Sequence, residues 1–562
     1  MMKGGTGMKI LLAAVNAKFI HTNPAVRSLR AYAAAAGYSS GIAEYTINQS
    51  RDFILADLYR LQPDVLAFSC YIWNREMIFS LLDDLPKILP DTELWLGGPE
   101  VSYDAEEILR ARPEIRGIMT GEGEATFREL CARWTAGSPE FTDIAGCCVN
   151  TENGPVFTGI REPVPMDDIP FFYNDMNEFR DRIPYYESSR GCPFRCTYCL
   201  SSIDKHVRFR SLSLVLPELQ FFLDAKVPQV KFIDRTFNCD HTRCLTIWRF
   251  LAEHDNGITN FHFEIAADLL NDEELDLLCS LRPGLVQLEI GVQTTHPETV
   301  TAIRRSMDLT VLEKVVRRLR SANNIHLHLD LIAGLPEEDL PTFRQSFDRV
   351  FAMSAHDLQL GFLKVLKGSP MQEMAPEYDL KYRKEPPYEV LSTRWLGYGD
   401  LLELKGVEEM LELYHNSGQY TTILPLLIRE TGSAYEFFLQ LSRWYRDHGY
   451  EVCQPSRLQR YTVLLEFART RRPENSVLYA ECLTFDCYLR EKCKRRPEFS
   501  PDLIPYKTLT ASAGARPEDH TDVFRYAVWE KEPALLPGPV AVIFRYDRRD
   551  AIHRNAAFDI VQ

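Results

Sequence analysis

The chain contains 562 residues, and at roughly 150 residues per domain this length predicts three to four domains that each bury a core. Hydrophobic residues make up 45% and charged residues 25%, which excludes global disorder and a fibrous repeat. The net charge of −15 repels phosphate backbones, so we expect no nucleic-acid partner.

The cellular setting is inferred from the apolar segments and the cysteines. The apolar run near the N-terminus fits a first strand better than a signal peptide, and no window reaches about 18 uninterrupted apolar residues. We therefore expect a cytoplasmic protein without a membrane partner. The 14 cysteines are too few for a disulfide framework in so long a chain, so clustered cysteines indicate metal ligands or redox groups.

Residues 8–135 alternate between short apolar runs and amphipathic helical stretches. The runs cover residues 9–17, 41–47, 64–72, 93–98 and 117–122, and the helical stretches cover residues 26–36, 52–61, 75–89, 103–112 and 125–134. Apolar strands separated by helices predict a parallel sheet that is covered on both faces. This pattern is typical of a doubly wound α/β domain of about five strands, whose ligand lies at the strand C-termini.

Residues 136–184 break this pattern with glycine, proline and aspartate, which predicts a linker with a hairpin around Glu152–Gly154. The β/α alternation resumes over residues 185–370. Six strands are expected there, over residues 184–191, 230–237, 260–268, 285–293, 326–336 and 357–366. Six such steps indicate a full or partial TIM-like barrel, with its chemistry at the strand C-termini. Residues 371–562 are mainly helical in spacing and end in an α/β tail with one clear strand, VAVIFRY.

Three cysteines follow the first barrel strand in the run RGCPFRCTYC. Cys192, Cys196 and Cys199 form a CxxxCxxC pattern, which lets one short loop ligate three irons of a cubane cluster. The fourth iron then remains open for an external ligand. A structural zinc site is the alternative, but it usually needs four ligands, and no second pair of cysteines follows nearby.

This loop, with an aromatic residue before its last cysteine, resembles the radical S-adenosylmethionine (SAM) superfamily. The resemblance implies a [4Fe–4S] cluster that binds SAM and cleaves it to a 5′-deoxyadenosyl radical. LEIGVQTTHPETV resembles the strand that contacts the SAM ribose, and HLDLIAGLPEED resembles the strand whose turn packs near the adenine, with Glu337 in place of the usual second glycine. The SAM contacts implied by the resemblance are Tyr198, Asp234, Asn238, Glu264, Glu289, Gln293, Thr294 and Gly334. For the carboxylates, a salt-bridged residue at the barrel mouth is the alternative interpretation.

The first domain resembles the cobalamin-binding domains that precede some radical SAM domains. The resemblance covers residues 8–135 and depends on KFIHTNPAVRSLRAYA, GGPEVSYDAEEIL and GEGEATFREL, which follow the first, fourth and fifth strands. Glycines at strand ends let a bulky ligand approach the backbone, although they also make tight turns. The implied cobalamin contacts are Asn16, His21, Thr22, Tyr71, Trp73, Gly97, Gly98, Glu100, Gly121 and Gly123.

The cobalt is expected to have no histidine ligand from the protein. Many cobalamin domains supply one in a DxHxxG motif. Only His206 has an aspartate two residues before it, and Phe209 occupies the glycine position. Tyr71 and Trp73, after the third strand, would cover the lower face of the cobalt, with ordinary core packing as the alternative.

Three further cysteines occur in ECLTFDCYLREKCKRRP. A second cluster at Cys482, Cys487 and Cys493 is conceivable, but their spacing favours free structural cysteines, and we predict that they hold no metal. The charged run after them is better interpreted as a solvated surface than as a phosphate site.

The resemblance predicts a cobalamin-dependent radical SAM enzyme, with C-methylation from methylcobalamin as the leading hypothesis. The catalytic residues are not identified by the sequence. Radical cyclisation or rearrangement, with cobalamin as a redox partner, is the alternative. We expect a small-molecule or peptide substrate and an external one-electron reductant such as flavodoxin or ferredoxin.

A tRNA methylthiotransferase is disfavoured by the cysteines and the charge. Those enzymes carry three further cluster cysteines in the preceding domain and a basic RNA-binding tail. Here Cys70, Cys131, Cys147 and Cys148 are irregularly spaced, and the net charge is −15. The C-terminal third resembles an uncharacterised extension found in one subgroup of these proteins, which leaves the substrate open.

Overall fold

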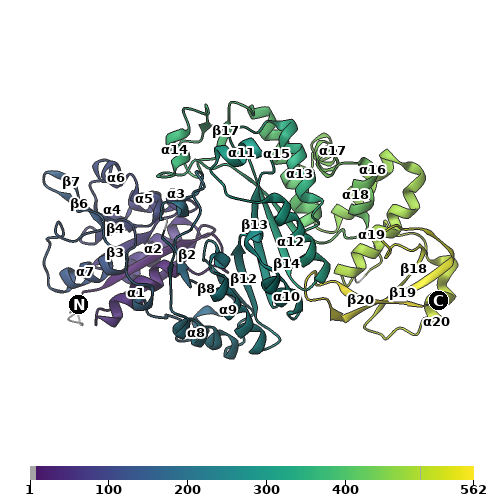
Figure 1. Ribbon diagram of the computed structural model, residues 1–562, viewed down its shortest axis with the longest axis horizontal. Coiled ribbons are helices and arrows are strands. Elements are labelled where there is room, and N and C mark those ends of the chain that lie inside the picture. Colours follow the sequence, from purple (N-terminus) through teal and green to yellow (C-terminus); the bar gives the residue numbers. More distant parts are fainter. Residues whose placement is uncertain (1–7, 205, 494, 562) are drawn as a thin grey trace. The chain divides into compact units, whose positions relative to one another are not determined.

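The computed structural model describes residues 8–204, 206–493 and 495–561 (Figure 1). The chain divides into two compact units. The first unit contains the residues up to Ala266 together with Ile303–Ser306 and Lys364–Leu391. The second unit contains Ala267–Ala302, Met307–Leu363 and the residues from Ser392 onward. Each unit is described by itself below.

A seven-stranded sheet forms the N-terminal part of the first unit. Its strands are β1 (Ile10–Asn16), β2 (Gly41–Thr46), β3 (Val65–Ser69), β4 (Glu93–Gly97), β5 (Ile115–Met119), β6 (Cys147–Thr151) and β7 (Gly154–Phe157), in the order β2-β1-β3-β4-β5-β6-β7. The first five are parallel, as the sequence predicts. The helices between them are α1 (Pro24–Ala35), α2 (Arg51–Leu61), α3 (Arg75–Leu82), α4 (Leu85–Ile88), α5 (Pro99–Ser102), α6 (Ala105–Ala111) and α7 (Glu124–Thr135).

Both faces of this sheet are buried, because successive side chains of β1 enter different cores. Leu11, Ala13 and Val15 belong to one hydrophobic cluster, whereas Leu12 and Ala14 belong to another. A strand whose two faces are both covered reads as a continuous apolar run. The strand order reverses between β1 and β3, and a doubly wound sheet binds its ligand at that point, beyond the strand C-termini.

The predicted hairpin is present, with its turn at Glu152–Asn153 between β6 and β7. It is more than part of a linker, because β6 pairs antiparallel with β5 and extends the N-terminal sheet. Gly117 lies opposite Val149 in this pairing. The hairpin thereby satisfies the backbone groups that β5 would otherwise expose as an edge strand.

The remainder of the first unit starts the second β/α series. Its strands are β8 (Tyr185–Tyr186), β9 (Ser189–Arg190), β10 (Arg208–Phe209), β11 (Gln229–Phe232), β12 (Asn260–Ile265), β16 (Lys381–Tyr382) and β17 (Val390–Ser392, whose last residue falls in the second unit). Its helices are α8 (Leu212–Asp224), α9 (His241–Glu253) and α14 (Pro370–Met374). Strand β11 pairs in parallel with both β8 and β12.

The second unit continues the series with three parallel strands, β13 (Val286–Gln293), β14 (His326–Ala333) and β15 (Asp357–Phe362). The helices here are α10 (Asp272–Ser280), α11 (Pro297–Ala302), α12 (Leu309–Ala322) and α13 (Leu340–Phe351). All six strands predicted over residues 184–366 are therefore present.

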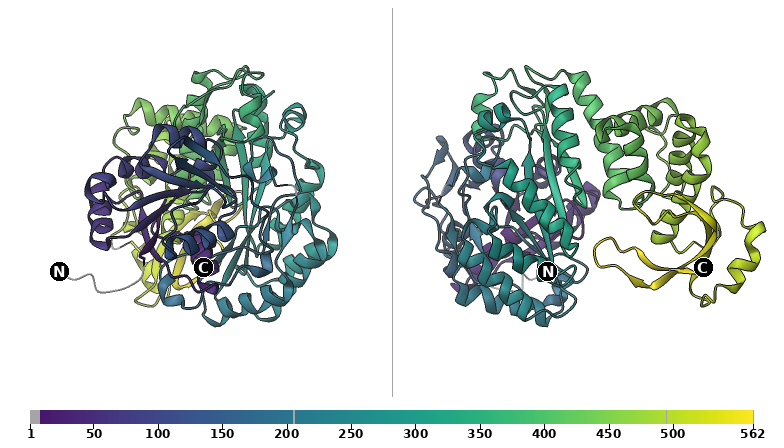
Figure 2. Two further views of the ribbon diagram at one scale, coloured as in Figure 1. Left: turned by 90° about the vertical axis from the view of Figure 1, so that its left-hand side faces the viewer. Right: turned by 45° about the vertical axis from the view of Figure 1, so that its right-hand side comes forward.

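The C-terminal part of the second unit is helical and ends in a small antiparallel sheet (Figure 2). The helices are α15 (Tyr398–Leu411), α16 (Ile423–Thr431), α17 (Ala434–Asp447), α18 (Gln459–Arg471), α19 (Ser476–Arg490) and α20 (Lys507–Ser512). The predicted strand VAVIFRY lies in β19 (Leu535–Arg549), between β18 (His520–Tyr526) and β20 (Ala556–Val561). Helix α19 contacts both outer strands.

The fold class predicted from the sequence is confirmed: a doubly wound domain precedes a β/α region of TIM-barrel type and a mainly helical C-terminal part. Within the described ranges, no helix combines the length and the apolar character that a membrane crossing requires.

Candidate functional site

The cysteine triplet lies on an irregular loop that follows β9 in the first unit. The loop begins at Gly191, whose φ of 93° lies in the left-handed region. A Cβ at this position would stand 2.5 Å from the carbonyl oxygen of His206. Only glycine therefore allows the loop to start in this direction.

Backbone hydrogen bonds from three other segments hold this cysteine loop. The Cys192 amide donates to the carbonyl of Asp204 at 3.2 Å. The Thr197 amide donates to Ile303 at 3.0 Å, and the Thr197 carbonyl accepts from the Met371 amide at 2.9 Å. The segments that contain Ile303 and Met371 are distant in sequence, and both belong to the first unit.

Cys192 and Cys196 are buried, and Cys199 is partly exposed. The Cys192 sulfur lies 3.6 Å from the Thr236 hydroxyl. Among the described residues, no three His, Cys, Asp or Glu side chains gather as ligands of a single metal ion. Three thiols spaced along one anchored loop fit a cluster, in which each thiolate ligates a different iron.

Arg305 is a residue that the sequence analysis missed. Its Nη1 lies 3.8 Å from the Cys196 sulfur and 3.2 Å from the Tyr198 hydroxyl. Burial raises the pKa of Cys196, and the Arg305 guanidinium opposes this shift. A fixed positive charge beside a cluster thiolate stabilises the anionic form. Arg305 follows the cysteines by more than 100 residues, so no local spacing could identify it.

Two predicted SAM contacts in the first unit make internal hydrogen bonds. The buried Asp234 carboxylate accepts from the Ser188 amide at 2.8 Å, the Ser188 hydroxyl at 2.6 Å and the Ser189 hydroxyl at 2.7 Å. The Asn238 side chain bonds both backbone groups of Ala266, at 2.8 and 2.9 Å. Both residues thus fix the strand ends around the cysteine loop, and their contact with SAM stays a prediction.

The other predicted SAM contacts lie on strands or directly after them. Glu264 is on β12 of the first unit, whereas Glu289 and Gln293 are on β13 of the second unit. The Thr294 hydroxyl donates to the buried Glu338 carboxylate at 2.8 Å. Gly334 follows β14 with a φ of 88°. Glu264 belongs to the first unit and the other four residues belong to the second unit, and their common role in SAM binding stays a prediction.

The turn after β14 keeps a left-handed residue although its usual glycine is replaced. Glu337 has a φ of 64°. A non-glycine residue pays a steric penalty in this region because its Cβ crowds the backbone. Glu337 therefore holds this turn in a left-handed conformation at the expense of local strain.

A cavity of about 630 Å³ lies at the C-terminal edge of the N-terminal sheet, entirely within the first unit. It lies where the strand order reverses, lined by the ends of β3, β4 and β5 and by Leu12 of β1. Five of the predicted cobalamin contacts line it, namely Tyr71, Gly97, Gly98, Gly121 and Gly123. This volume is typical of a ligand pocket.

The glycines at this edge serve different purposes. A Cβ at Gly98 would stand 2.4 Å from the Cys70 carbonyl oxygen, so Gly98 is needed for the close approach of two strand ends. At Gly121 no atom lies within 4 Å of the Cβ position, and φ is 70°. Gly121 therefore leaves open space beside the backbone, as a bound ligand requires.

The other five predicted cobalamin contacts are not part of the cavity wall, and hydrogen bonds hold them elsewhere. Asn16 bonds the His21 carbonyl, and the His21 ring bonds the Tyr185 hydroxyl at 2.6 Å. Thr22 donates to the Ile183 carbonyl at 3.1 Å. These bonds attach the loop after β1 to the start of the β/α series.

Glu100 and Trp73 also have structural partners. Glu100 is buried, accepts a hydrogen bond from Tyr388 and lies 3.4 Å from Arg75. Trp73 donates to the Val15 carbonyl at 3.2 Å and stacks on Tyr71, with ring centroids 4.4 Å apart. Tyr71 thus faces the cavity with Trp73 behind it.

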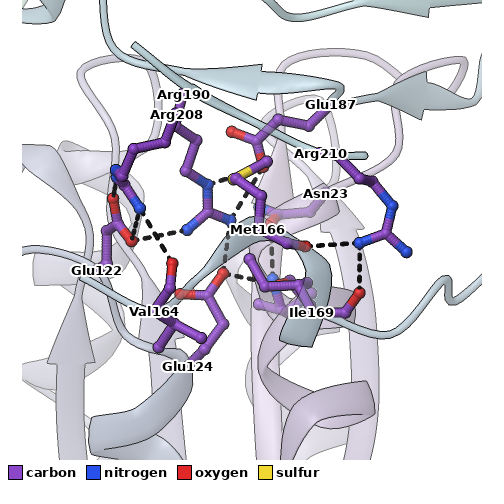
Figure 3. A network of polar contacts seen from close by, with 12 residues as sticks. Asn23, Glu122, Glu124, Val164, Met166, Ile169, Glu187, Arg190, Arg208 and Arg210 are labelled. Carbon is purple, nitrogen blue, oxygen red and sulfur yellow. Dashed lines mark hydrogen bonds and ion pairs between the residues drawn. The ribbon is translucent and has the colours of Figure 1, made fainter. Parts of the chain in front are cut away.

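An ionic network at Arg190 connects the cavity wall with the cysteine loop (Figure 3). Arg190 lies two residues before Cys192 and bonds Glu122 at 3.1 Å, Glu124 at 2.6 Å and Glu187 at 2.9 Å. All four residues line the cavity. The network therefore fixes the N-terminus of α7 against the strand that leads into the cysteine loop.

The two inner carboxylates of this network have opposite pKa shifts. Burial alone would raise the pKa of Glu124, but Arg190 and the Ser28 hydroxyl bring it below its ordinary value. Burial raises the pKa of Glu187, against the opposing charge of Arg190. Of these two carboxylates, Glu124 therefore has the stronger preference for the anionic form beside Arg190.

Another part of the cavity wall comes from the end of the hairpin and the segment after it, which the sequence analysis treated as a linker. Phe157, Ile160, Met166, Ile169 and Phe171–Tyr173 give it an apolar surface. Arg210 holds this segment by donating to the carbonyls of Met166 and Ile169 at 2.6 and 2.8 Å (Figure 3). The proline-rich run REPVPMDDIPFF marks this segment in the sequence. Its residue spacing does not predict that its side chains line the cavity.

Three family models match the chain. The B12 binding domain matches residues 10–131, the Radical SAM superfamily matches residues 186–350, and a protein family of unknown function, DUF4080, matches residues 376–525. The chain therefore combines a B12-binding domain with a radical SAM domain. Cobalamin, a [4Fe–4S] cluster and SAM, which the sequence predicts as cofactors, are the cofactors that these two domains indicate.

Individual relatives agree with this combination of domains. The cobalamin-dependent radical SAM methyltransferase TokK of Streptomyces tokunonensis is 26% identical over 68% of this chain and 61% of its own length. The uncharacterized methyltransferase PH0819 of Pyrococcus horikoshii is 33% identical over 51% of this chain and 65% of its own length. The chain thus spans less than two thirds of these relatives.

Among solved structures, the cobalamin-dependent SAM radical enzyme OxsB, with aqua-cobalamin and SAM bound, has a similar fold. The TM-score is 0.60 at 16% identity, over 85% of this chain and 78% of that one.

Proposed function

We propose that this protein is a cobalamin-dependent radical SAM methyltransferase that methylates carbon. The observation that carries the proposal is the Arg190 network, which joins the cavity of the B12-binding domain to the cysteine loop within one unit. Enzymes that combine two cofactors must hold them at fixed positions around one reaction space. A cavity and a cluster loop that share an anchoring residue meet this need.

The bound cofactors would supply a 5′-deoxyadenosyl radical for hydrogen abstraction and a methyl group carried on cobalt. The thiolates of Cys192, Cys196 and Cys199 would hold the cluster, and Arg305 would stabilise the Cys196 thiolate through its charge. Thr236 contacts the Cys192 sulfur and limits its movement. These residues set the cluster's position and charge environment.

The cavity residues would hold part of the cobalamin. Gly121 leaves room beside the backbone, and Tyr71 covers one wall with a large ring. The apolar segment Phe171–Tyr173 excludes water from the opposite wall. Exclusion of water protects reactive groups from side reactions.

The substrate class and the partners extend this proposal. A small molecule or a peptide is the expected substrate, because the net charge of −15 disfavours nucleic acid. A flavodoxin or ferredoxin would supply single electrons to the cluster in the cytoplasm.

Analysis of SAM-derived products tests the proposal. Anaerobically reconstituted protein, given a reductant and candidate substrates, is expected to form both 5′-deoxyadenosine and S-adenosylhomocysteine. Deoxyadenosine alone, together with a cyclised or rearranged product, would favour the alternative in which cobalamin is a redox partner. Formation of neither product with every substrate, in protein that carries all three cofactors, would contradict both.

A further inference from the structure

Two cysteines face each other at the end of helix α19, in the second unit. The sulfur atoms of Cys487 and Cys493 are 3.7 Å apart. Cys487 is fully buried in the last turn of α19, whereas Cys493 lies in the following segment and is partly exposed. At this distance the two thiols are in hydrogen-bonding contact, and a disulfide requires the sulfurs to close to about 2.05 Å.

Hydrogen bonds of Arg490 and Glu491 fix the backbone between the end of α19 and Cys493. The Glu491 amide donates to the Cys487 carbonyl at 2.7 Å, and the Glu491 carbonyl accepts from the Tyr546 hydroxyl at 3.0 Å. Arg490 donates to the His553 carbonyl. The two thiols are therefore held near each other by the backbone and by the β19–β20 hairpin.

We propose that Cys487 and Cys493 form a reversible disulfide, in which Cys493 reacts first and Cys487 resolves. The site is separate from the cysteine loop of Cys192, Cys196 and Cys199, so the proposal does not depend on the proposed function. It also agrees with the expectation that these cysteines hold no metal.

The chemistry needs an oxidant, and a small disulfide such as glutathione disulfide supplies it. The Cys493 thiolate attacks one sulfur of that disulfide and releases one small thiolate. The Cys487 thiol then loses its proton and attacks the Cys493 sulfur, which releases the second small thiolate. The two protein thiols lose two electrons and two protons, and the small disulfide is reduced to two thiols.

The order of attack follows from exposure and acidity. Cys493 is the more accessible thiol, and the hydrogen bond between the two thiols lowers the pKa of Cys493. The same hydrogen bond, followed by burial, raises the pKa of Cys487. An accessible, more acidic thiol is the one that attacks, and its buried neighbour is suited to the second step.

Two other cysteines provide matched controls. Cys482 lies five residues before Cys487 on the same helix, which turns it about 140° away at roughly 100° per residue, and it is equally buried. Cys453 is exposed. Cys482 controls for burial in α19, and Cys453 controls for exposure without a neighbouring thiol.

The experiment treats the anaerobic, cofactor-loaded full chain with glutathione disulfide, blocks the remaining thiols and maps the peptides by mass spectrometry. The wild type is expected to link Cys487 to Cys493 and to lose the link with dithiothreitol, whereas Cys453 becomes glutathionylated. Cys487→Ser is expected to leave Cys493 glutathionylated, and Cys493→Ser to leave Cys487 free. Cys482→Ser and Cys453→Ser are expected to retain the link.

Three results would overturn the proposal. One is a wild type in which Cys453 reacts fully while both thiols of the pair stay free. Another is a stable glutathione adduct on Cys493 that Cys487 does not displace. The last is iron or zinc that is bound in the wild type and lost in Cys487→Ser. The first two results are read on the wild type, so a variant that fails to fold leaves those two tests intact.

Discussion

The guanidinium of Arg305 contacts the Cys196 sulfur and the Tyr198 hydroxyl, and it brings a positive charge from a distant segment to the cysteine loop. Positive charge near a cluster favours its reduced state. We expect Arg305→Met to lower the reduction potential of the cluster and to slow SAM cleavage about tenfold, equivalent to about 1.4 kcal/mol. An electron paramagnetic resonance (EPR) redox titration measures the potential.

Tyr198→Phe is the control for Arg305, because it removes the hydroxyl contact and keeps the charge. The potential is expected to stay close to that of the wild type. An Arg305→Met protein with an unchanged potential would show that the guanidinium has no electrostatic effect on the cluster.

Each cysteine of the loop is expected to be essential for the cluster. Changing Cys192, Cys196 or Cys199 to Ala removes one thiolate and should abolish both the ~400 nm absorbance and SAM cleavage. Cys239→Ala is the matched control, because Cys239 is a partly buried cysteine outside the loop. Full iron content and cleavage in any single loop variant would contradict the assignment.

Glu337 provides a test of backbone strain. Because its φ of 64° costs a non-glycine residue about 1–2 kcal/mol, Glu337→Gly should relieve strain at some cost in unfolded-chain entropy. We expect a net gain of about 0.5–1 kcal/mol in the free energy of unfolding, measured by urea denaturation. A loss of stability would mean that the Glu337 side chain contributes more than the turn strain costs.

At the residue scale, the sequence predicts the cluster ligands because their spacing is local. Arg305 and the Arg190 network escape prediction because their partners come from distant segments. Asp234 shows that a residue predicted from the sequence as a ligand contact can also have a structural role. Its type and position fit a ligand contact, but three hydrogen bonds to Ser188 and Ser189 give it a structural role that no sequence pattern specifies.

At the element scale, two glycines at neighbouring strand ends are expected to respond differently to substitution. Gly98→Ala places a Cβ 2.4 Å from the Cys70 carbonyl, so we expect a loss of about 3 kcal/mol in the free energy of unfolding. Gly121→Ala meets no atom within 4 Å and pays only the cost of its positive φ, about 1 kcal/mol. Urea denaturation of both variants compares the two values.

Gly121 should also affect the ligand. Gly121→Val is expected to weaken cobalamin binding at least tenfold in equilibrium titrations, because its side chain would occupy the cavity. Unchanged affinity in a folded Gly121→Val protein would place the cobalamin elsewhere.

The strands and helices could be predicted from the sequence because both faces of the parallel strands are apolar. The pairing of β6 with β5 could not be predicted, because the sequence signal for a hairpin does not reveal which sheet edge the hairpin joins. The same holds for Glu100, whose partner Tyr388 lies 288 residues away.

At the scale of the whole molecule, the coordination of cobalt links sequence and structure. His21 is the one histidine among residues 8–135, and its ring bonds Tyr185 and does not line the cavity. Cob(II)alamin bound to the protein should therefore give an EPR spectrum without nitrogen superhyperfine splitting. A nitrogen triplet in the wild type would refute this absence of a protein imidazole.

Tyr71 is the aromatic residue expected to shield the cobalt, because it lines the cavity and Trp73 supports it. Tyr71→Ala should admit water and change the cob(II)alamin spectrum from four- to five-coordinate. Trp73→Ala should have a smaller effect, because it removes only the support. An unchanged spectrum in both variants would assign the two rings to packing alone.

The most direct test of the central claim is the fate of the SAM methyl group. Protein loaded with cobalamin and cluster is reduced with SAM that carries a deuterated methyl group, and the bound cobalamin is then analysed by mass spectrometry. Methyl transfer predicts deuterated methylcobalamin on the protein and its deuterated methyl group on the product after turnover with substrate. Substrate conversion with deoxyadenosine formed, and with no label on cobalamin or product, would contradict the methyltransferase assignment.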